Sequence, residues 1–63
     1  MILPQDTYKE INGKAKYHIR KVESGEVTYT LEGHGETFTV SVGAFEKLLS
    51  GREAHSIVLV ARN

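Results

Sequence analysis

Three segments of this 63-residue chain alternate strictly between apolar and polar side chains, and this period of two constrains the fold more than any other feature. The segments span residues 15–20, 27–31 and 38–42. A strand points successive side chains to opposite faces of a sheet, so the alternation predicts three half-buried strands. Their β-branched and aromatic residues favour the same structure. The sequence therefore predicts a three-stranded antiparallel meander over about residues 14–42.

The loops between these segments decide which residues face one another, because a slip of one residue moves every side chain to the wrong face. A two-residue hairpin loop at residues 34–35 pairs Tyr29 with Val40. A three-residue loop at residues 23–25 pairs Ile19 with Tyr29. Together, these two loops gather the apolar side chains of all three strands on one face.

A further hairpin signal, Asn12-Gly13, stands before the meander. It predicts a strand over residues 5–11. The same two-residue loop sets Lys9 directly against Lys16, and like charges opposite one another destabilise a sheet.

After residue 42 the apolar spacing becomes helical, and the helix is expected to end near residues 50–51. The residues that share its apolar face are Ala44, Phe45, Leu48 and Leu49. Residues 57–61 then read as a closing strand that is apolar on both faces.

This order of elements, at this length, resembles a small SH3-like barrel, in which a short helical turn precedes the last strand. The predicted fold class is mainly β: a small SH3-like antiparallel barrel of about five strands, with one short helix before the last strand. No linker or internal repeat divides the chain, so residues 1–63 are predicted to form a single domain. Barrels of this kind serve unrelated functions, so the resemblance implies a fold and no activity.

Composition excludes several classes of protein. Eight basic and eight acidic residues cancel, which argues against a dedicated nucleic-acid or anionic-membrane binder. The chain has no cysteine, so a small core must be stabilised by tight packing or by association with another chain. It shows neither a signal peptide nor a membrane-spanning apolar run, which predicts a cytoplasmic protein without membrane partners.

No pattern of catalytic or metal-binding residues emerges from the sequence. The three histidines, His18, His34 and His55, fall in separate elements and lack the spacing of zinc motifs. The glycines around His34 are explained by a turn, and no serine has a nucleophile context. We therefore expect a non-enzymatic protein that uses no metal and no cofactor.

A row of basic residues is the most informative functional feature. Four of them alternate along one side of the first predicted strand and a fifth follows at its end. They are Lys14, Lys16, His18, Arg20 and Lys21. Such a row can bind phosphates or an acidic protein surface. The alternative is an ordinary solvated face that Glu32 and neighbouring threonines neutralise.

The closing strand is the second feature, because an uncovered apolar edge strand promotes aggregation. If Ile57 and Leu59 enter the core, Val58 and Val60 are left on the other face. Either barrel closure and the helix cover the closing strand, or a second copy does, in which case these two valines mediate a weak homodimer.

Two functions follow from these features. The first is an interaction module that binds a protein partner as a small regulator or inhibitor. Short, cysteine-free, self-contained domains of this kind resemble products of compact genomes such as those of phages. The alternative is a small nucleic-acid-binding barrel that uses Lys14, Lys16 and Arg20. The protein partner is preferred because few aromatic side chains are available for base stacking on the basic side.

Overall fold

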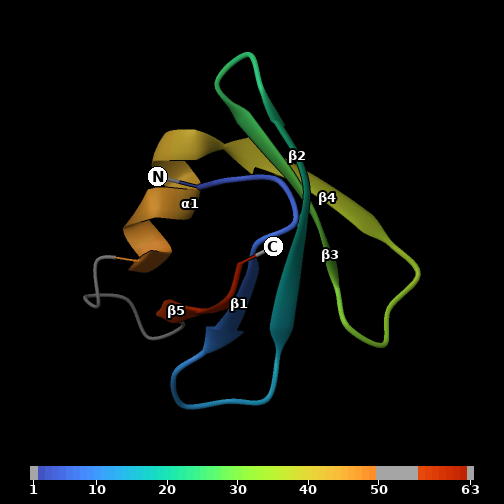
Figure 1. Cartoon of the computed structure of the whole chain (residues 1–63), viewed down its shortest axis with the longest axis vertical. Coiled ribbons are helices and arrows are strands. Elements are labelled where there is room, and N and C mark those ends of the chain that lie inside the picture. The colour runs from blue at the N-terminus through green and yellow to red at the C-terminus, as the bar shows by residue number, and fades with distance from the viewer. Residues whose placement is uncertain (1, 50–55, 63) are drawn as a thin grey trace.

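The computed structural model describes residues 2–49 and 56–62, which form one antiparallel sheet and one helix. The elements are β1 (Thr7–Glu10), β2 (Lys16–Glu23), β3 (Glu26–Leu31), β4 (Thr37–Ser41), α1 (Val42–Leu49) and β5 (Ile57–Ala61). The five strands lie in the order β4-β3-β2-β1-β5 (Figure 1). The mainly β architecture and the helix before the last strand are thereby confirmed.

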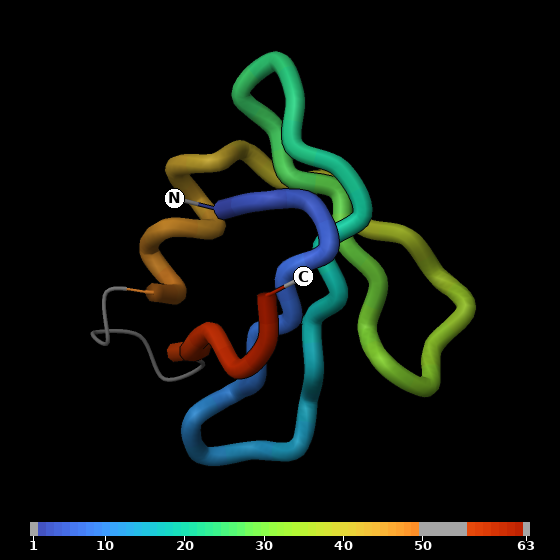
Figure 2. Tube along the Cα trace, viewed as in Figure 1, coloured from blue at the N-terminus to red at the C-terminus, as the bar shows by residue number. Residues whose placement is uncertain are grey.

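The sheet is open in the part of the chain that the structure describes. Its two edges are β4 and β5, and no pairing joins them among those residues. The strands curve around the core and α1 packs on the remaining side, so that the helix contacts β3, β4 and β5 (Figures 1 and 2). A closed barrel and the SH3-like likeness therefore stay predictions. No helix among the described residues is long and apolar enough to cross a membrane.

The pairing of β1 with β2 follows the predicted register, although β1 is shorter than expected. Lys9 lies directly opposite Lys16. The Lys9 ammonium group turns toward the connecting loop, where it donates to the backbone oxygens of Glu10 at 3.2 Å and Gly13 at 2.8 Å. Because these carbonyls draw the charge away from Lys16, the sheet tolerates the like-charge pair.

The hairpin of β2 and β3 has the predicted pairing of Ile19 with Tyr29, but it reaches this pairing differently. The turn contains two residues, Ser24 and Gly25, both in the left-handed region with φ of 51° and 75°. Positive φ at both positions gives a turn whose twist matches that of the strands. A bulge at Arg20 supplies the extra residue that we expected in a three-residue loop.

The predicted two-residue loop between β3 and β4 is wrong. Tyr29 pairs with Phe38, two positions from the expected partner. The chain turns earlier because Gly33 adopts a φ of 85° and the His34 N–H donates to the Leu31 oxygen at 3.0 Å. A shift of two residues preserves the alternation of faces, so the apolar side chains still share one side.

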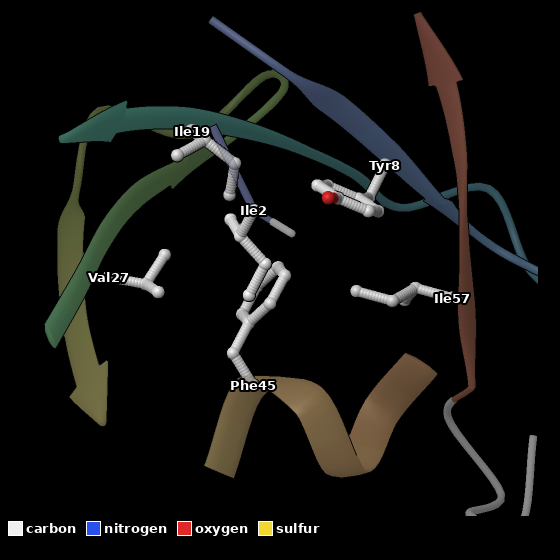
Figure 3. Close-up of a cluster of buried hydrophobic side chains, with 6 residues drawn as sticks. All are labelled: Ile2, Tyr8, Ile19, Val27, Phe45 and Ile57. Carbon is white, nitrogen blue, oxygen red and sulfur yellow. The ribbon is translucent and has the colours of Figure 1, made fainter. Parts of the chain in front are cut away.

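The core lies between the sheet and α1, and Figure 3 shows Phe45 pointing from the helix into its centre. Its buried apolar members are Ile2, Tyr8, Ile19, Val27, Phe45 and Ile57. All five aromatic rings of the chain are linked by ring contacts with centroid separations of 5.3–6.3 Å. The inner side therefore holds every aromatic side chain. We had not expected Ile2 to join this core.

Candidate functional site

The side of the sheet turned away from the core, called the outer face here, carries hydroxyl and charged side chains. The pairing of the strands places on it Thr7, Lys9, Lys16, His18, Arg20, Lys21, Thr28, Thr30, Glu32, Thr37 and Thr39. Threonines predominate on β3 and β4, whereas basic residues predominate on β1 and β2. The basic end of the outer face is therefore the candidate site.

The structure places most of the predicted basic row on this face, with two differences. Lys16 and His18 are half-buried on β2, and Arg20 is exposed at the bulge. Lys14 is exposed but precedes β2, in the loop from β1. Lys21 is expected at the end of the strand but lies within it, because β2 continues to residue 23.

Two members of the row have acidic partners. His18 is held between Glu32, at 3.3 Å from its Nε2, and the Thr7 hydroxyl, at 3.3 Å from its Nδ1. Lys21 Nζ lies 2.9 Å from a carboxylate oxygen of Glu23, and both of these side chains are more than half exposed. Exposed pairs contribute little to stability, but they reduce the charge offered to a partner.

The other three, Lys14, Lys16 and Arg20, have no carboxylate partner in the described part of the chain. Arg20 Nε donates to the Thr30 hydroxyl at 3.1 Å, which directs the guanidinium group across β3. This bond uses one of five N–H donors, so the group keeps donors for a carboxylate or a phosphate. We call Lys16 and Arg20 on the outer face, together with Lys14 in the loop before β2, the basic face.

A buried carboxylate that the sequence did not reveal lies at the other end of β1. Asp6 is fully buried and accepts hydrogen bonds from the Leu3 N–H at 2.9 Å and the Tyr8 hydroxyl at 3.2 Å. Arg62 completes the set with a bidentate pair, in which Nε and Nη2 each lie 2.9 Å from a carboxylate oxygen. The two residues are 56 positions apart, and nothing in the sequence pattern links them.

The hydrogen bonds from Arg62 are the largest cause that lowers the pKa of Asp6 below its usual value, against the opposing effect of burial. Burial first, and then the hydrogen bond to Asp6, raise the pKa of Tyr8. Four hydrogen bonds reach this carboxylate, three of them at Oδ2 and one at Oδ1. Asp6 is therefore an ionised tie that joins the N-terminal turn, β1 and the residue after β5.

The closing strand differs from its prediction in one respect. Ile57 is buried, but Leu59, which we expected beside it in the core, is 41% exposed. A bulge in the pairing of β1 with β5 near the end of the ladder accompanies this exposure. Val58 and Val60 are 45% and 51% exposed, so about half of each residue stays accessible.

The other sequence predictions concern residues away from the basic face. His34 is exposed in the loop between β3 and β4, and His55 and the predicted helix end at residues 50–51 lie outside the described residues. Within residues 2–49 and 56–62 there is no cluster of three or more metal-binding side chains. Comparisons of the chain with protein-family models, curated proteins and solved structures found no match.

Proposed function

We propose that the chain is a non-enzymatic interaction module that binds an acidic protein surface through the basic face. The observation that supports this most directly is the presence, among the described residues, of three cations without carboxylate partners, one of which, Lys16, lies directly opposite Lys9. Like charges gathered on two neighbouring strands oppose folding. Local violations of this kind are typical of functional surfaces, where an oppositely charged partner offsets them.

A protein partner is favoured over a nucleic acid by the position of the aromatic residues. Single-stranded nucleic acids are bound by stacking bases on exposed rings. All five rings of this chain instead contact one another on the inner side. The formal net charge of zero also weakens long-range attraction to a phosphate backbone. Nucleic-acid binding through the same three residues is the alternative function.

The proposal also includes an SH3-like architecture and the role of a small regulator or inhibitor. The curved sheet and the position of α1 before the last strand support an SH3-like architecture. A module of this size with one charged face suits a small cytoplasmic regulator or inhibitor, such as those of phages. Pairing of β4 with β5 in an experimentally determined structure would establish the barrel.

The proposal is tested by charge reversal, using Arg20→Glu on the basic face and Lys47→Glu on α1 as a matched control. Immobilised wild-type chain and both variants are incubated with extract of the source cells at low and high salt. We expect proteins retained by the wild type and by Lys47→Glu to bind Arg20→Glu about tenfold less, mainly at low salt.

Treatment with nuclease separates the two functions. Retention that survives nuclease supports the protein partner, and retention lost with nuclease supports the alternative, since phosphate contacts give a steep salt dependence. Equal retention by the wild type and by Arg20→Glu contradicts both functions of the basic face. Two-dimensional NMR spectra confirm beforehand that each variant is folded.

A further inference from the structure

Asn12 and Gly13 lie in the loop between β1 and β2 (Figure 1). The Glu10 N–H donates to the Ala15 oxygen at 3.0 Å and closes this loop, so residues 11–14 lie outside the ladder. The Asn12 side chain is exposed to solvent. An asparagine followed by glycine favours a turn, but its side-chain amide can also react with the next backbone nitrogen.

The surroundings of Gly13 leave this nitrogen available. The loop favours glycine at position 13, because the Glu10 side chain occupies the space that a Cβ would take. A glycine has no side chain to shield its nitrogen from the preceding residue. The Gly13 N–H is also held weakly: it reaches the Glu10 backbone oxygen at 3.5 Å, beyond the usual range of about 2.7–3.2 Å.

We propose that Asn12 is a site of spontaneous deamidation, which converts it into an acidic residue beside the basic face. Asparagine is a thermolabile residue, and an attack within one chain avoids the entropic cost of bringing two molecules together. The Gly13 nitrogen attacks Asn12 Cγ, and a carbon–nitrogen bond forms between them. The bond from Cγ to Nδ2 breaks, and the amide nitrogen leaves as ammonia with the proton of the Gly13 N–H.

Water completes the reaction by opening the cyclic imide at either of its carbonyl carbons. Attack at Cγ breaks the new bond to the Gly13 nitrogen and gives aspartate. Attack at the backbone carbonyl carbon of residue 12 breaks the original peptide bond and gives isoaspartate. In both cases one water is consumed, one ammonia is released, and a carboxylate replaces the neutral amide.

The product places a negative charge among cations. Lys14 lies two residues further along the loop, and the Lys9 ammonium group is held in the same loop by the Gly13 oxygen at 2.8 Å. A carboxylate at position 12 lowers the charge that the basic face offers to an acidic partner. Deamidation thus acts as a slow, irreversible switch, and this consequence rests on the function proposed for that face.

The fold is expected to survive either product. The reacting bonds lie inside the loop, whereas the bond from Glu10 to Ala15 and the pairs of β1 with β2 lie outside it. Isoaspartate lengthens the main chain by one carbon, a change that an exposed loop tolerates. Weaker binding by the modified chain therefore reports its charge rather than its unfolding.

Peptide mapping after incubation at physiological temperature tests the chemistry. Trypsin cleaves after Lys9 and Lys14, so the peptide of residues 10–14 contains Asn12 as its only side-chain amide. The peptide of residues 1–9 contains Gln5 and serves as the internal control. We expect the first peptide to gain the mass of the deamidated product, in aspartate and isoaspartate forms, while the second stays unchanged. The rate should rise with hydroxide concentration, since the attacking nitrogen must lose its proton.

The same incubation in urea shows whether the folded loop permits the reaction. The rate in the folded chain should stay within about tenfold of the rate in the unfolded chain, because an exposed loop opens at a free energy near zero. Asn12→Gln is the control variant, since its longer side chain cyclises more slowly. An Asn12 that stays intact in the folded chain while it is converted in urea overturns the proposal.

Immobilised polyglutamate tests the effect on the basic face. Asn12→Asp carries the charge of the product, and His34→Asp adds a negative charge in the exposed loop between β3 and β4 as a matched control. We expect Asn12→Asp to bind polyglutamate about two- to fivefold more weakly than the wild type, and His34→Asp to bind nearly as the wild type does. Equal binding by Asn12→Asp and the wild type contradicts the switch. A wild type that does not bind polyglutamate counts against the function proposed for the basic face, whereas the peptide map still decides whether Asn12 is modified.

Discussion

Asp6 connects parts of the chain that no local pattern links. Its four hydrogen bonds join the backbone N–H of Leu3, the hydroxyl group of Tyr8 and the guanidinium group of Arg62. A buried carboxylate left without such partners would be strongly unfavourable, so the four bonds depend on one another. A single residue thus holds the N-terminal turn against the end of β5.

Replacement of this residue is expected to make stability less dependent on pH. Asp6→Asn should lower the free energy of unfolding at pH 7 by about 1–3 kcal/mol, because the charge and several acceptor positions are lost. The pKa of Asp6 is lowered in the folded state, mainly by Arg62. The wild-type carboxylate therefore stabilises the fold above its unfolded pKa of about 3.9, and this contribution disappears as the pH falls through the lower folded value.

The difference in unfolding free energy between wild type and Asp6→Asn should thus shrink below about pH 4. Urea unfolding followed by circular dichroism between pH 7 and pH 2 measures it. Glu36→Gln serves as the control, because Glu36 is an exposed carboxylate in the loop between β3 and β4 and its removal should change little. A difference that stays constant down to pH 2 would show that the Asp6 charge does not stabilise the fold.

The elements show which features the sequence predicted well. Alternation identified the faces of β2, β3 and β4, because a period of two follows directly from strand geometry. It could not select between registers that differ by two residues. The predicted pairing of Tyr29 with Ile19 was therefore correct, whereas the predicted pairing of Tyr29 with Val40 was wrong, since Tyr29 pairs with Phe38. Alternation also did not show where in this hairpin the extra residue lies, and the structure places it in a bulge at Arg20 instead of in a longer turn.

The candidate site was predictable in part for the same reason. The alternation of Lys16, His18 and Arg20 placed them on one face, and the structure agrees. The sequence could not show that Glu32 pairs with His18 and leaves Lys16 without an acidic partner, since this depends on side-chain geometry across strands. The Asp6 tie could not be predicted from spacing either, because it joins the two ends of the chain.

In the turn between β2 and β3, substitutions at two adjacent residues should change the free energy of unfolding in opposite directions. Ser24 adopts a φ of 51°, a conformation that asparagine accepts more readily than serine. Ser24→Asn should therefore raise the free energy of unfolding by about 0.5 kcal/mol. Gly25→Ala should lower it by about 1 kcal/mol, because Gly25 has a φ of 75° and a side chain there is strained although space is open.

Thermal unfolding of the two variants and the wild type measures both effects. Thr39→Ala, a change on the outer face of the edge strand β4, is the reference for a substitution without consequence for the turn. A Ser24→Asn chain less stable than the wild type would mean that the turn does not have positive φ at both central residues.

At the scale of the whole molecule, the charges that separate along the sequence are brought together by the sheet. Residues 1–22 carry five basic and two acidic groups, and residues 23–63 carry three basic and six acidic groups. The pairing of β2 with β3 places the two halves side by side, as His18 and Glu32 illustrate. The basic face is thus a local feature of β2 and the loop before it, which is why a net charge of zero does not exclude it.

The arrangement of strands also predicts that stability is distributed unevenly. β2 and β3 lie inside the sheet and carry the buried Ile19 and Val27, whereas β5 is an edge with a single buried residue, Ile57. Segments with few buried contacts open locally at a lower free energy than the whole domain unfolds. In dilute solution the amide of Val58 should therefore exchange with solvent deuterium about 10–100-fold faster than those of Ile19 and Val27.

Hydrogen exchange followed by NMR gives these rates residue by residue. Equal protection of β5 and of the β2–β3 hairpin in dilute solution would show that the domain opens only as one unit. In that case the hydrogen bonds between Asp6 and Arg62 would protect β5 from local opening as well as the neighbouring strands protect β2 and β3.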